Sequence, residues 1–538
     1  MARTTNRAKP DIKAKDAGSP MPPLGRVSVR MYRQGLGDCF LITLPKQNGS
    51  PWRMLIDCGV ILGTQDTAAR LKEVVQNLVD DTDGRVDVLA VTHEHYDHVA
   101  AFAGPPKLFC GQHETRQDGQ LQVGEVWFAW TEDPSDALGR KLSKTRADQV
   151  NRLAAMVAGL QSTNRAMTPA TSELTNGVAD LIGGFFGLEQ KDFAQARGHL
   201  TGQGVAAVNE PGNGADGGAR HPGATARAME NARALGGTDG KRVRYWDPGD
   251  APWTSPDLPG VRIYALGPPR DESLLKKTFM SDEVYHLAAS QAANTAFFGA
   301  AGLNAVAPEV SQENSWFPFD AAYGRELRDP ASDASVRMPE VTAEFLQRHY
   351  YGPSSDVGEQ DQSWRRIDED WLGSAAQFAL NLDSATNNTS LVLAIELSPG
   401  AEVLLFPADA QVGNWLSWQK VQWSLDGNKT VTATDLLKRT VFYKVGHHGS
   451  HNATLREHGL ELMPHGLAAL LPVDHEMAVK KHWDGMPLPG LIDALKAHDA
   501  KVARMDDANV PNDTRFRTSD KQGKSFKGPV FYEWRLDT

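Results

Sequence analysis

Residues 91–98, VTHEHYDH, are the stretch that decides how this chain folds and what it binds. His93, His95, Asp97 and His98 place four metal-binding side chains within six residues. The run before them, residues 86–91, is apolar and β-branched and therefore predicts a buried strand. The four side chains stand where a core strand ends, and imidazole with carboxylate suits Zn, Mn or Fe. The spacing predicts a metal site.

Composition places the chain among globular proteins without a basic surface. It has 538 residues, 41% of them hydrophobic and 23% charged. Lys and Arg number 56 against 67 Asp and Glu, a formal net charge of −11. This balance excludes a uniformly basic nucleic-acid surface and leaves a local basic groove open.

Cysteine usage and the N-terminal segment indicate a cytoplasmic protein. The three cysteines, Cys39, Cys58 and Cys110, are too few for a disulfide framework, which favours a reducing compartment. Residues 1–26 lack an apolar segment of the secretory type, so we expect a disordered tail. No run of about 18 apolar residues occurs, so we expect no membrane contact.

Periodicity predicts an α/β (α+β) chain with a mixed sheet and helices packed on it. The expected strands are 27–32, 39–44, 52–59, 86–91, 261–266, 390–397, 402–406, 440–445, 467–473 and 530–534, and the expected helices are 66–80, 145–160, 224–235, 366–382 and 488–498. Regions of about 100–260 and 270–385 depart from this pattern and are expected to be insertions.

Polar side chains recur at the ends of the expected strands. Asp57, Asp409 and His447 each follow an apolar strand, as the 93–98 cluster does. Strand ends at one edge of a sheet meet in space, and a metal needs ligands that arrive from several directions. These residues are therefore expected to converge.

The order of these motifs resembles the metallo-β-lactamase-fold hydrolases, and within them the hydrolase domain of the competence (DNA-uptake) proteins. The similar segments are GLGDCFLI at 35–42, LIDCG at 55–59, THEHYDH at 92–98, NTSLVL at 388–393 and KVGHHGS at 444–450. The resemblance implies a four-layer αβ/βα sandwich over residues 27–538, with the two large insertions capping the metal edge.

The resemblance also implies a role for each motif residue. His93 and His95 would hold one metal, Asp97, His98 and His447 a second, and Asp409 would bridge them. Asp57 would orient a histidine from outside the ligand set. His448 is the alternative ligand to His447, which is preferred because it is nearer the strand end. Asp97 and His448 are the expected catalytic residues, Asp97 by orienting a water or taking its proton.

The sequence departs from the family pattern in two places. The usual Gly-Asp around the bridging acid is Ala408-Asp409 here, a mild change in backbone freedom. Residues 387–390 read Asn-Asn-Thr-Ser where the superfamily usually has a histidine. Asn387 and Asn388 leave the first metal position without a strong ligand, so one or two zinc ions, or manganese, are compatible with the sequence.

The expected function is that of a metal-dependent hydrolase. A divalent metal lowers the pKa of bound water from 15.7 to about 7, which provides hydroxide at neutral pH. A phosphodiesterase or nuclease is the leading interpretation, acting on a small molecule, nucleotide or nucleic acid. Hydrolysis of a lactone, ester or amide is the alternative, and a metal-binding protein without turnover is a third hypothesis. The sequence does not identify any protein partner, so protein partners stay unknown.

Overall fold

The structure is a computed structural model of the chain. It describes residues 26–162, 169–201, 223–237, 239–280, 282–284, 341–342, 344–345, 370–425, 429–481, 483 and 485–537. The expected tail, residue 26 apart, and much of the expected 270–385 insertion lie outside these ranges. Within them, no helix combines the length and apolarity needed to cross a bilayer.

A nine-stranded mixed sheet combines the N-terminal region with the last strands of the chain. Its order is β17-β18-β1-β2-β3-β4-β6-β5, with β7 paired to β6. The strands are β1 (Val27–Tyr32), β2 (Phe40–Pro45), β3 (Pro51–Ile56), β4 (Arg85–Ala90), β5 (Phe109–Gly111), β6 (Leu121–Ala129), β7 (Val243–Trp246), β17 (Phe516–Thr518) and β18 (Phe531–Leu536). β3 and β4 are parallel because helix α1 (Thr67–Thr82) crosses between them.

A seven-stranded sheet comes mainly from the second half of the chain, in the order β16-β15-β14-β11-β10-β9-β8. Its strands are β8 (Trp253–Ser255), β9 (Leu258–Gly267), β10 (Val392–Glu396), β11 (Val403–Phe406), β14 (Thr440–Lys444), β15 (Ala468–Leu471) and β16 (Lys501–Arg504). Strands β11, β14, β15 and β16 run parallel to one another, so their C-terminal ends lie at one edge of the sheet. A separate hairpin joins β12 (Gln422–Leu425) and β13 (Lys429–Thr432).

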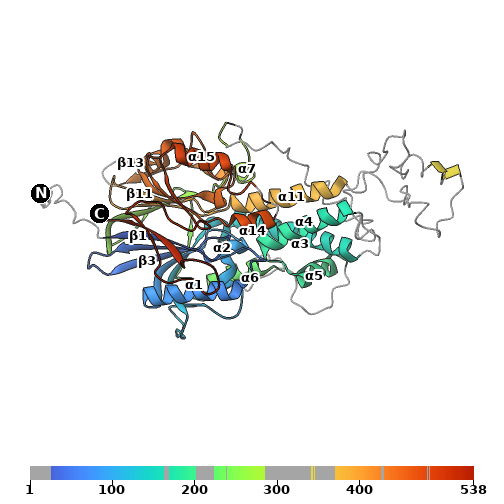
Figure 1. The fold of residues 1–538 in the computed structure, drawn as a ribbon, viewed down its shortest axis with the longest axis horizontal. Coiled ribbons are helices and arrows are strands. Elements are labelled where there is room, and N and C mark those ends of the chain that lie inside the picture. Colours follow the sequence, from blue (N-terminus) through green and yellow to red (C-terminus); the bar gives the residue numbers. More distant parts are fainter. Residues whose placement is uncertain are drawn as a thin grey trace, which may run out of the picture.

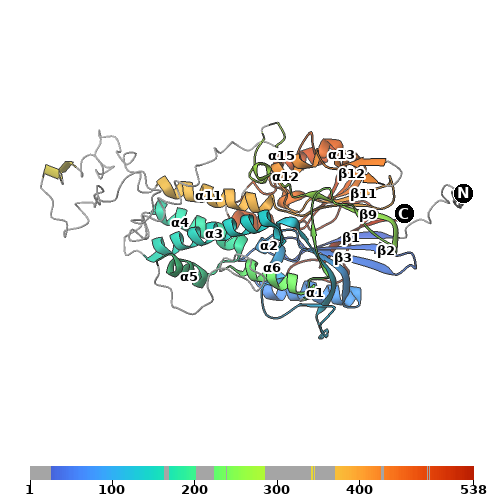
Figure 2. The ribbon, with the colours of Figure 1, turned by 180° about the vertical axis from the view of Figure 1, so that it is seen from behind.

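The two sheets share one apolar core. The Phe40 ring of the first sheet lies 6.3 Å from the Phe406 ring of the second, and Phe442 lies 5.1 Å from Trp534, centroid to centroid. Helices α1 and α6 (Ala224–Ala234) cover the outer face of the first sheet (Figure 1). Helices α12 (Val412–Trp418), α13 (Ala433–Leu437) and α15 (Pro489–Ala497) lie with the second sheet (Figure 2), and the short helix α14 (His475–Lys480) follows β15. The fold is therefore mixed α/β, with two facing sheets and helices outside.

Four further helices gather beyond one end of the sheets, where both views show them side by side (Figures 1 and 2). They are α3 (Ala137–Ser162), α4 (Pro169–Phe186), α5 (Gln190–Thr201) and α11 (Asp370–Asn387). The expected insertion at 100–260 is narrower than the sequence suggested, because β5, β6 and β7 from this region are strands of the first sheet. Among the described residues of this region, helices α3, α4 and α5 between β6 and β7 lie outside the sheets.

Candidate metal centre

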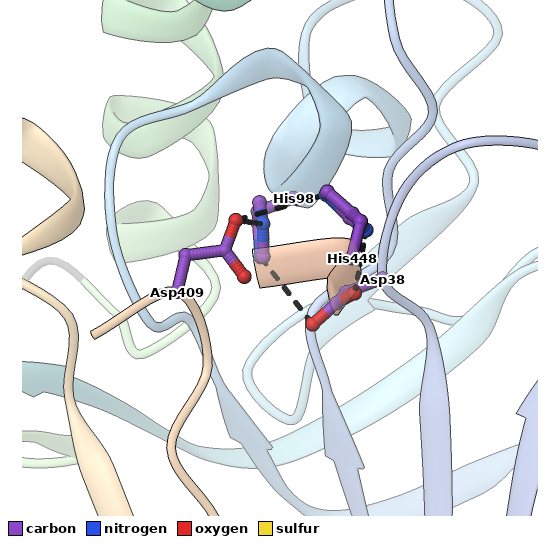
Figure 3. A group of neighbouring side chains, drawn as sticks. All are labelled: Asp38, His98, Asp409 and His448. Atoms are coloured by element: carbon purple, nitrogen blue, oxygen red, sulfur yellow. Dashed lines mark hydrogen bonds and ion pairs between the residues drawn. The ribbon is translucent and has the colours of Figure 1, made fainter. Parts of the chain in front are cut away.

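The residues singled out in the sequence meet at one place. Asp57 follows β3, residues 93–98 follow β4, Asp409 follows β11, and His447 and His448 follow β14. The candidate ligand side chains are buried: His447 is 5% exposed, and 2% or less is exposed in Asp57, His93, His95, Asp97, His98, Asp409 and His448. Figure 3 shows His98, His448 and Asp409 turned toward one another, although His98 lies 311 residues before Asp409 in sequence and still further before His448. The expected convergence of strand ends is observed.

Asp57 connects the end of β3 to the loop after β4. Its Oδ1 accepts a hydrogen bond from the Thr92 backbone N–H at 2.8 Å, and its Oδ2 accepts one from the Thr92 hydroxyl at 2.7 Å. The same Oδ2 lies 2.8 Å from Nδ1 of His98. Asp57 has a left-handed backbone, φ 55°, which places its carboxylate across the strand ends. It is therefore placed to orient His98.

His98 lies between two carboxylates. Its Nδ1 faces Asp57, and its Nε2 lies 3.0 Å from Oδ2 of Asp409. Burial alone would lower the pKa of His98, but Asp409, Asp38, Asp97 and Asp57 outweigh burial and raise it well above its usual value. The carboxylates around His98 therefore favour a positive charge at its Nε2.

His447 and His448 adopt left-handed backbones in succession, with φ 41° and φ 52°. Such conformations cost energy in non-glycine residues and are concentrated at functional sites. His448 donates from Nδ1 to the Pro472 carbonyl at 2.6 Å, and its Nε2 lies 2.8 Å from Oδ2 of Asp97. His447 Nε2 lies 3.9 Å from Oδ2 of Asp409.

The tightest group of candidate ligands differs in part from the sequence-based set. Asp38, His98, Asp409 and His448 offer ligand atoms that all lie within 4.8 Å of one another (Figure 3). His448, rather than the preferred His447, belongs to this group. Which of two adjacent histidines faces a ligand depends on backbone dihedral angles, and the sequence does not show these.

Asp38 belongs to the motif at residues 35–42, but the sequence did not identify it as a site residue. Its Oδ2 pairs with Nζ of Lys444 at 2.6 Å, and the same Nζ lies 3.0 Å from Oδ1 of Asp409. Lys444 also donates to the Ala408 carbonyl at 2.7 Å. This buried lysine neutralises part of the acidic charge and holds the loop after β11 in place.

His93 and His95 form a second group. Nε2 of His93 lies 3.1 Å from Nδ1 of His95. Burial lowers the pKa of His93 well below its ordinary value and that of His95 to about 3, so both rings are neutral near pH 7. His95 also packs on Phe185 and Phe186 of α4, at centroid distances of 5.0 and 5.3 Å. The helices beyond the sheets therefore cover this side of the site.

A carboxylate that the sequence analysis missed faces His95. Oδ1 of Asp383, on α11, lies 3.7 Å from Nε2 of His95, and neither atom has a hydrogen-bond partner among the described residues. Burial, together with the charges of Asp97 and Asp409, raises the pKa of Asp383 well above its ordinary value. Asp383 lies one residue beyond the expected helix 366–382, inside the observed α11, and belongs to no motif, so the sequence offered no signal for it.

The two asparagines in place of the expected histidine have different surroundings. Asn388 binds backbone: its Nδ2 donates to the carbonyls of Leu275 and Lys277, and its Oδ1 accepts from the Gln411 amide. Asn387 faces the site, with its Nδ2 3.2 Å from Oδ2 of Asp383 and 3.4 Å from Nε2 of His447. Asn388 is therefore structural, and Asn387 borders the candidate centre.

The loop after β4 is also fixed from α3. Nη2 of Arg146 lies 2.6 Å from Oε2 of Glu94 and 3.2 Å from Oε1 of Glu132, and all three side chains are buried. The charges of Glu94 and Glu132 outweigh burial and raise the pKa of Arg146. This ion-pair triad attaches the histidine-bearing loop to a helix outside the sheets.

The donor set fits a divalent cation. One oxygen on each of Asp38, Asp97 and Asp383 is buried without a hydrogen-bond partner in the described structure. Buried unpaired carboxylates are costly unless a cation or a proton compensates them. Nitrogen and oxygen donors without thiolate suit Zn, Mn or Fe.

No protein-family model matches the sequence, and the comparison with curated proteins returns no similar chain.

Proposed function

We propose that this chain is a metal-dependent hydrolase of the metallo-β-lactamase type that acts on phosphodiesters. The order of the sequence motifs supports the family assignment. Two facing sheets with outer helices are compatible with the four-layer αβ/βα sandwich that the resemblance implies. The observation that carries the proposal is the meeting of Asp97, His98, Asp409 and His448 across as many as 351 residues of sequence.

Two ligand sets are available in this proposal. Asp97, His98, Asp409 and His448 would hold one ion, with His448 in the place that the sequence analysis gave to His447. His93 and His95 would contribute Nε2 and Nδ1 to another, with Asp409 between the two sets. Zinc or manganese is the proposed metal. A divalent ion in such a site supplies Lewis acidity and makes water ionise near neutral pH.

Asp97 is the group best placed to handle a proton. Its Oδ2 is occupied by His448, whereas its Oδ1 is buried and has no hydrogen-bond partner in the described part of the chain. Burial would raise the pKa of Asp97, but His98 and His448 outweigh it and lower the pKa to about 2. An ionised carboxylate with a free oxygen can orient a water molecule and accept its proton.

The proposed substrate class follows from charge. A phosphodiester accumulates negative charge on its non-bridging oxygens during hydrolysis, and a cationic centre stabilises that charge. The formal net charge of −11 favours a nucleotide, a short oligonucleotide or a phosphorylated small molecule over long DNA. Lactones, esters and amides belong in the substrate panel because a centre of this kind also activates water toward carbonyls.

The test combines elemental analysis with a substrate panel. The full chain, purified without chelator and supplied with Zn²⁺ or Mn²⁺, is assayed on bis-p-nitrophenyl phosphate, linear DNA, RNA, a lactone and an ester. Asp97→Ala is expected to abolish turnover and leave the circular dichroism spectrum unchanged. Asp192→Asn is the matched control, because Asp192 is a buried carboxylate on α5 that accepts from the Glu189 N–H at 2.8 Å.

Each outcome is informative. Metal uptake with phosphodiester cleavage that Asp97→Ala removes supports the proposal. Cleavage of only the lactone or ester would replace the substrate class and keep the reaction type. Metal uptake without any hydrolysis would indicate a metal-binding protein without turnover. A chain that takes up neither ion would remove the basis of the proposal.

A further inference from the structure

The carboxylate of Asp383 is buried near the candidate centre and has no cationic partner among the described residues. Asp383 is 6% exposed and lies one helical turn before Asn387, at the end of α11 that leads into β10. Its only hydrogen-bond partner among the described residues is the Asn387 amide at 3.2 Å. No lysine or arginine pairs with it in the described structure. A buried carboxylate without a cationic partner lowers stability, so its presence here indicates a function other than stabilising the fold.

The geometry of His95 indicates that function. A neutral imidazole carries one N–H, and the group facing its protonated nitrogen determines which nitrogen is free to bind a metal. Nε2 of His95 faces Oδ1 of Asp383 at 3.7 Å, while Nδ1 faces Nε2 of His93 at 3.1 Å. A proton held on Nε2 toward Asp383 leaves the Nδ1 lone pair directed at His93.

His93 shows the same arrangement. Its outer nitrogen, Nδ1, lies 3.1 Å from the Thr92 hydroxyl. That hydroxyl donates its own hydrogen to Asp57, so its oxygen is able to accept from His93. Each histidine therefore has an oxygen behind it, and the two inner nitrogens point to one place. Thr92 belongs to the recognisable motif, whereas Asp383 comes from a helix outside the sheets.

We propose that Asp383 is a positioning residue for metal binding: it holds His95 so that the His93–His95 pair presents two converging nitrogens. The inference rests on the proposed metal centre. The metal affinity of this pair then depends on α11. Asn387 links the same carboxylate to His447, so a single turn of α11 borders both histidine groups.

The test measures metal affinity rather than turnover. The full chain and its variants are titrated with Co²⁺ and Zn²⁺ against a competing chelator, and bound metal is counted by elemental analysis. Loss of an orienting partner typically costs about 10–100-fold in metal affinity. Asp383→Ala and Asp383→Asn are expected to weaken the more weakly held ion by this factor, and Asp383→Glu to recover part of it. Leu380→Ala is the control, since Leu380 lies on the same helix and is 41% exposed.

A second measurement separates positioning from a structural role. Removing a buried carboxylate without a cationic partner should leave the metal-free melting temperature unchanged or raise it, while the rise on adding Zn²⁺ shrinks. A purely structural Asp383 would lower the melting temperature equally with and without metal.

The possible failures are distinguishable. If the wild-type chain binds no divalent ion, the proposed function fails. If the wild type binds metal and Asp383→Asn binds it with unchanged affinity, only the role of Asp383 is overturned. An equal loss in Leu380→Ala would also overturn it, because the effect would then belong to the helix and not to the carboxylate.

Discussion

Nε2 of His448 lies 2.8 Å from Oδ2 of Asp97, although 351 residues separate the two in sequence. The contact connects the loop after β14 of one sheet to the loop after β4 of the other. Nδ1 of His448 is committed to the Pro472 carbonyl, which leaves Nε2 as the nitrogen that faces the acidic group. The His447 ring lies instead against the amides of Asn387 and Gln411.

Adjacent histidines should therefore respond differently to substitution. His448→Ala is expected to lose the more tightly bound ion and to abolish hydrolysis, because it removes a ligand from the compact group around Asp409. His447→Ala is expected to retain that ion. Elemental analysis of both variants, with His498→Gln as a buried histidine control, is the measurement. Equal metal loss in both would contradict the assignment of the two rings.

Asp57→Ala should weaken metal binding without removing a ligand. The substitution deletes the acceptor for His98 Nδ1 and for both Thr92 donors. We expect an affinity loss of about 10–100-fold, equivalent to about 1.4–2.7 kcal/mol. Chelator competition measures it, and Asp57→Asn should lose less because an amide oxygen still accepts. Unchanged affinity in Asp57→Ala would exclude an orienting role.

Arg146→Ala should destabilise the chain through the loop that carries the histidines. The change leaves Glu94 and Glu132 buried without their common cation. Breaking a buried ion pair in this way costs about 3–5 kcal/mol. Urea unfolding of this variant and of Arg140→Ala would measure the difference, because Arg140 lies on the same helix and its side chain donates only to the Pro134 carbonyl among the described residues. Similar losses in both would show that the triad is unimportant.

Metal removal should lower thermal stability. Without a cation, the buried carboxylates of Asp38, Asp97 and Asp409 repel one another, and Lys444 compensates only part of their charge. Chelation should therefore reduce the melting temperature, and added Zn²⁺ or Mn²⁺ should restore it. Asp409→Asn should shrink this metal-dependent difference. A melting temperature that is indifferent to chelator would argue against a resident ion.

Much of the fold was accessible from the sequence because the strands carry regular patterns. Residues 27–32 and 440–445 were expected as strands and are found as β1 (Val27–Tyr32) and β14 (Thr440–Lys444). β6 was not recognised, although eight of its nine positions are buried or half-buried. Gly124 interrupts its apolar run, and a Cβ there would lie 2.4 Å from the Asp87 carbonyl oxygen. The position needs glycine because the neighbouring strand is close, and such a tertiary cause cannot be seen in local periodicity.

In the candidate site, too, a local sequence pattern reveals some residues and only tertiary packing reveals another. His93, His95, Asp97 and His98 were identified because four metal-binding side chains in six residues form a local pattern. Asp383 is a single acid in a helix, and only the packing of α11 brings it to His95. The metal roles of all these residues stay predictions until an ion is measured.

Attempts to shorten this protein should take account of α11. A compact design would join β9 directly to β10, since none of the described residues between them forms a strand of either sheet. It would also delete Asp383 and Asn387 and expose the flank of His95. If the proposed metal centre is correct, the trimmed protein would keep its sheets and bind the proposed ion less tightly. Fragment design should therefore preserve residues 370–387, whatever is removed before them.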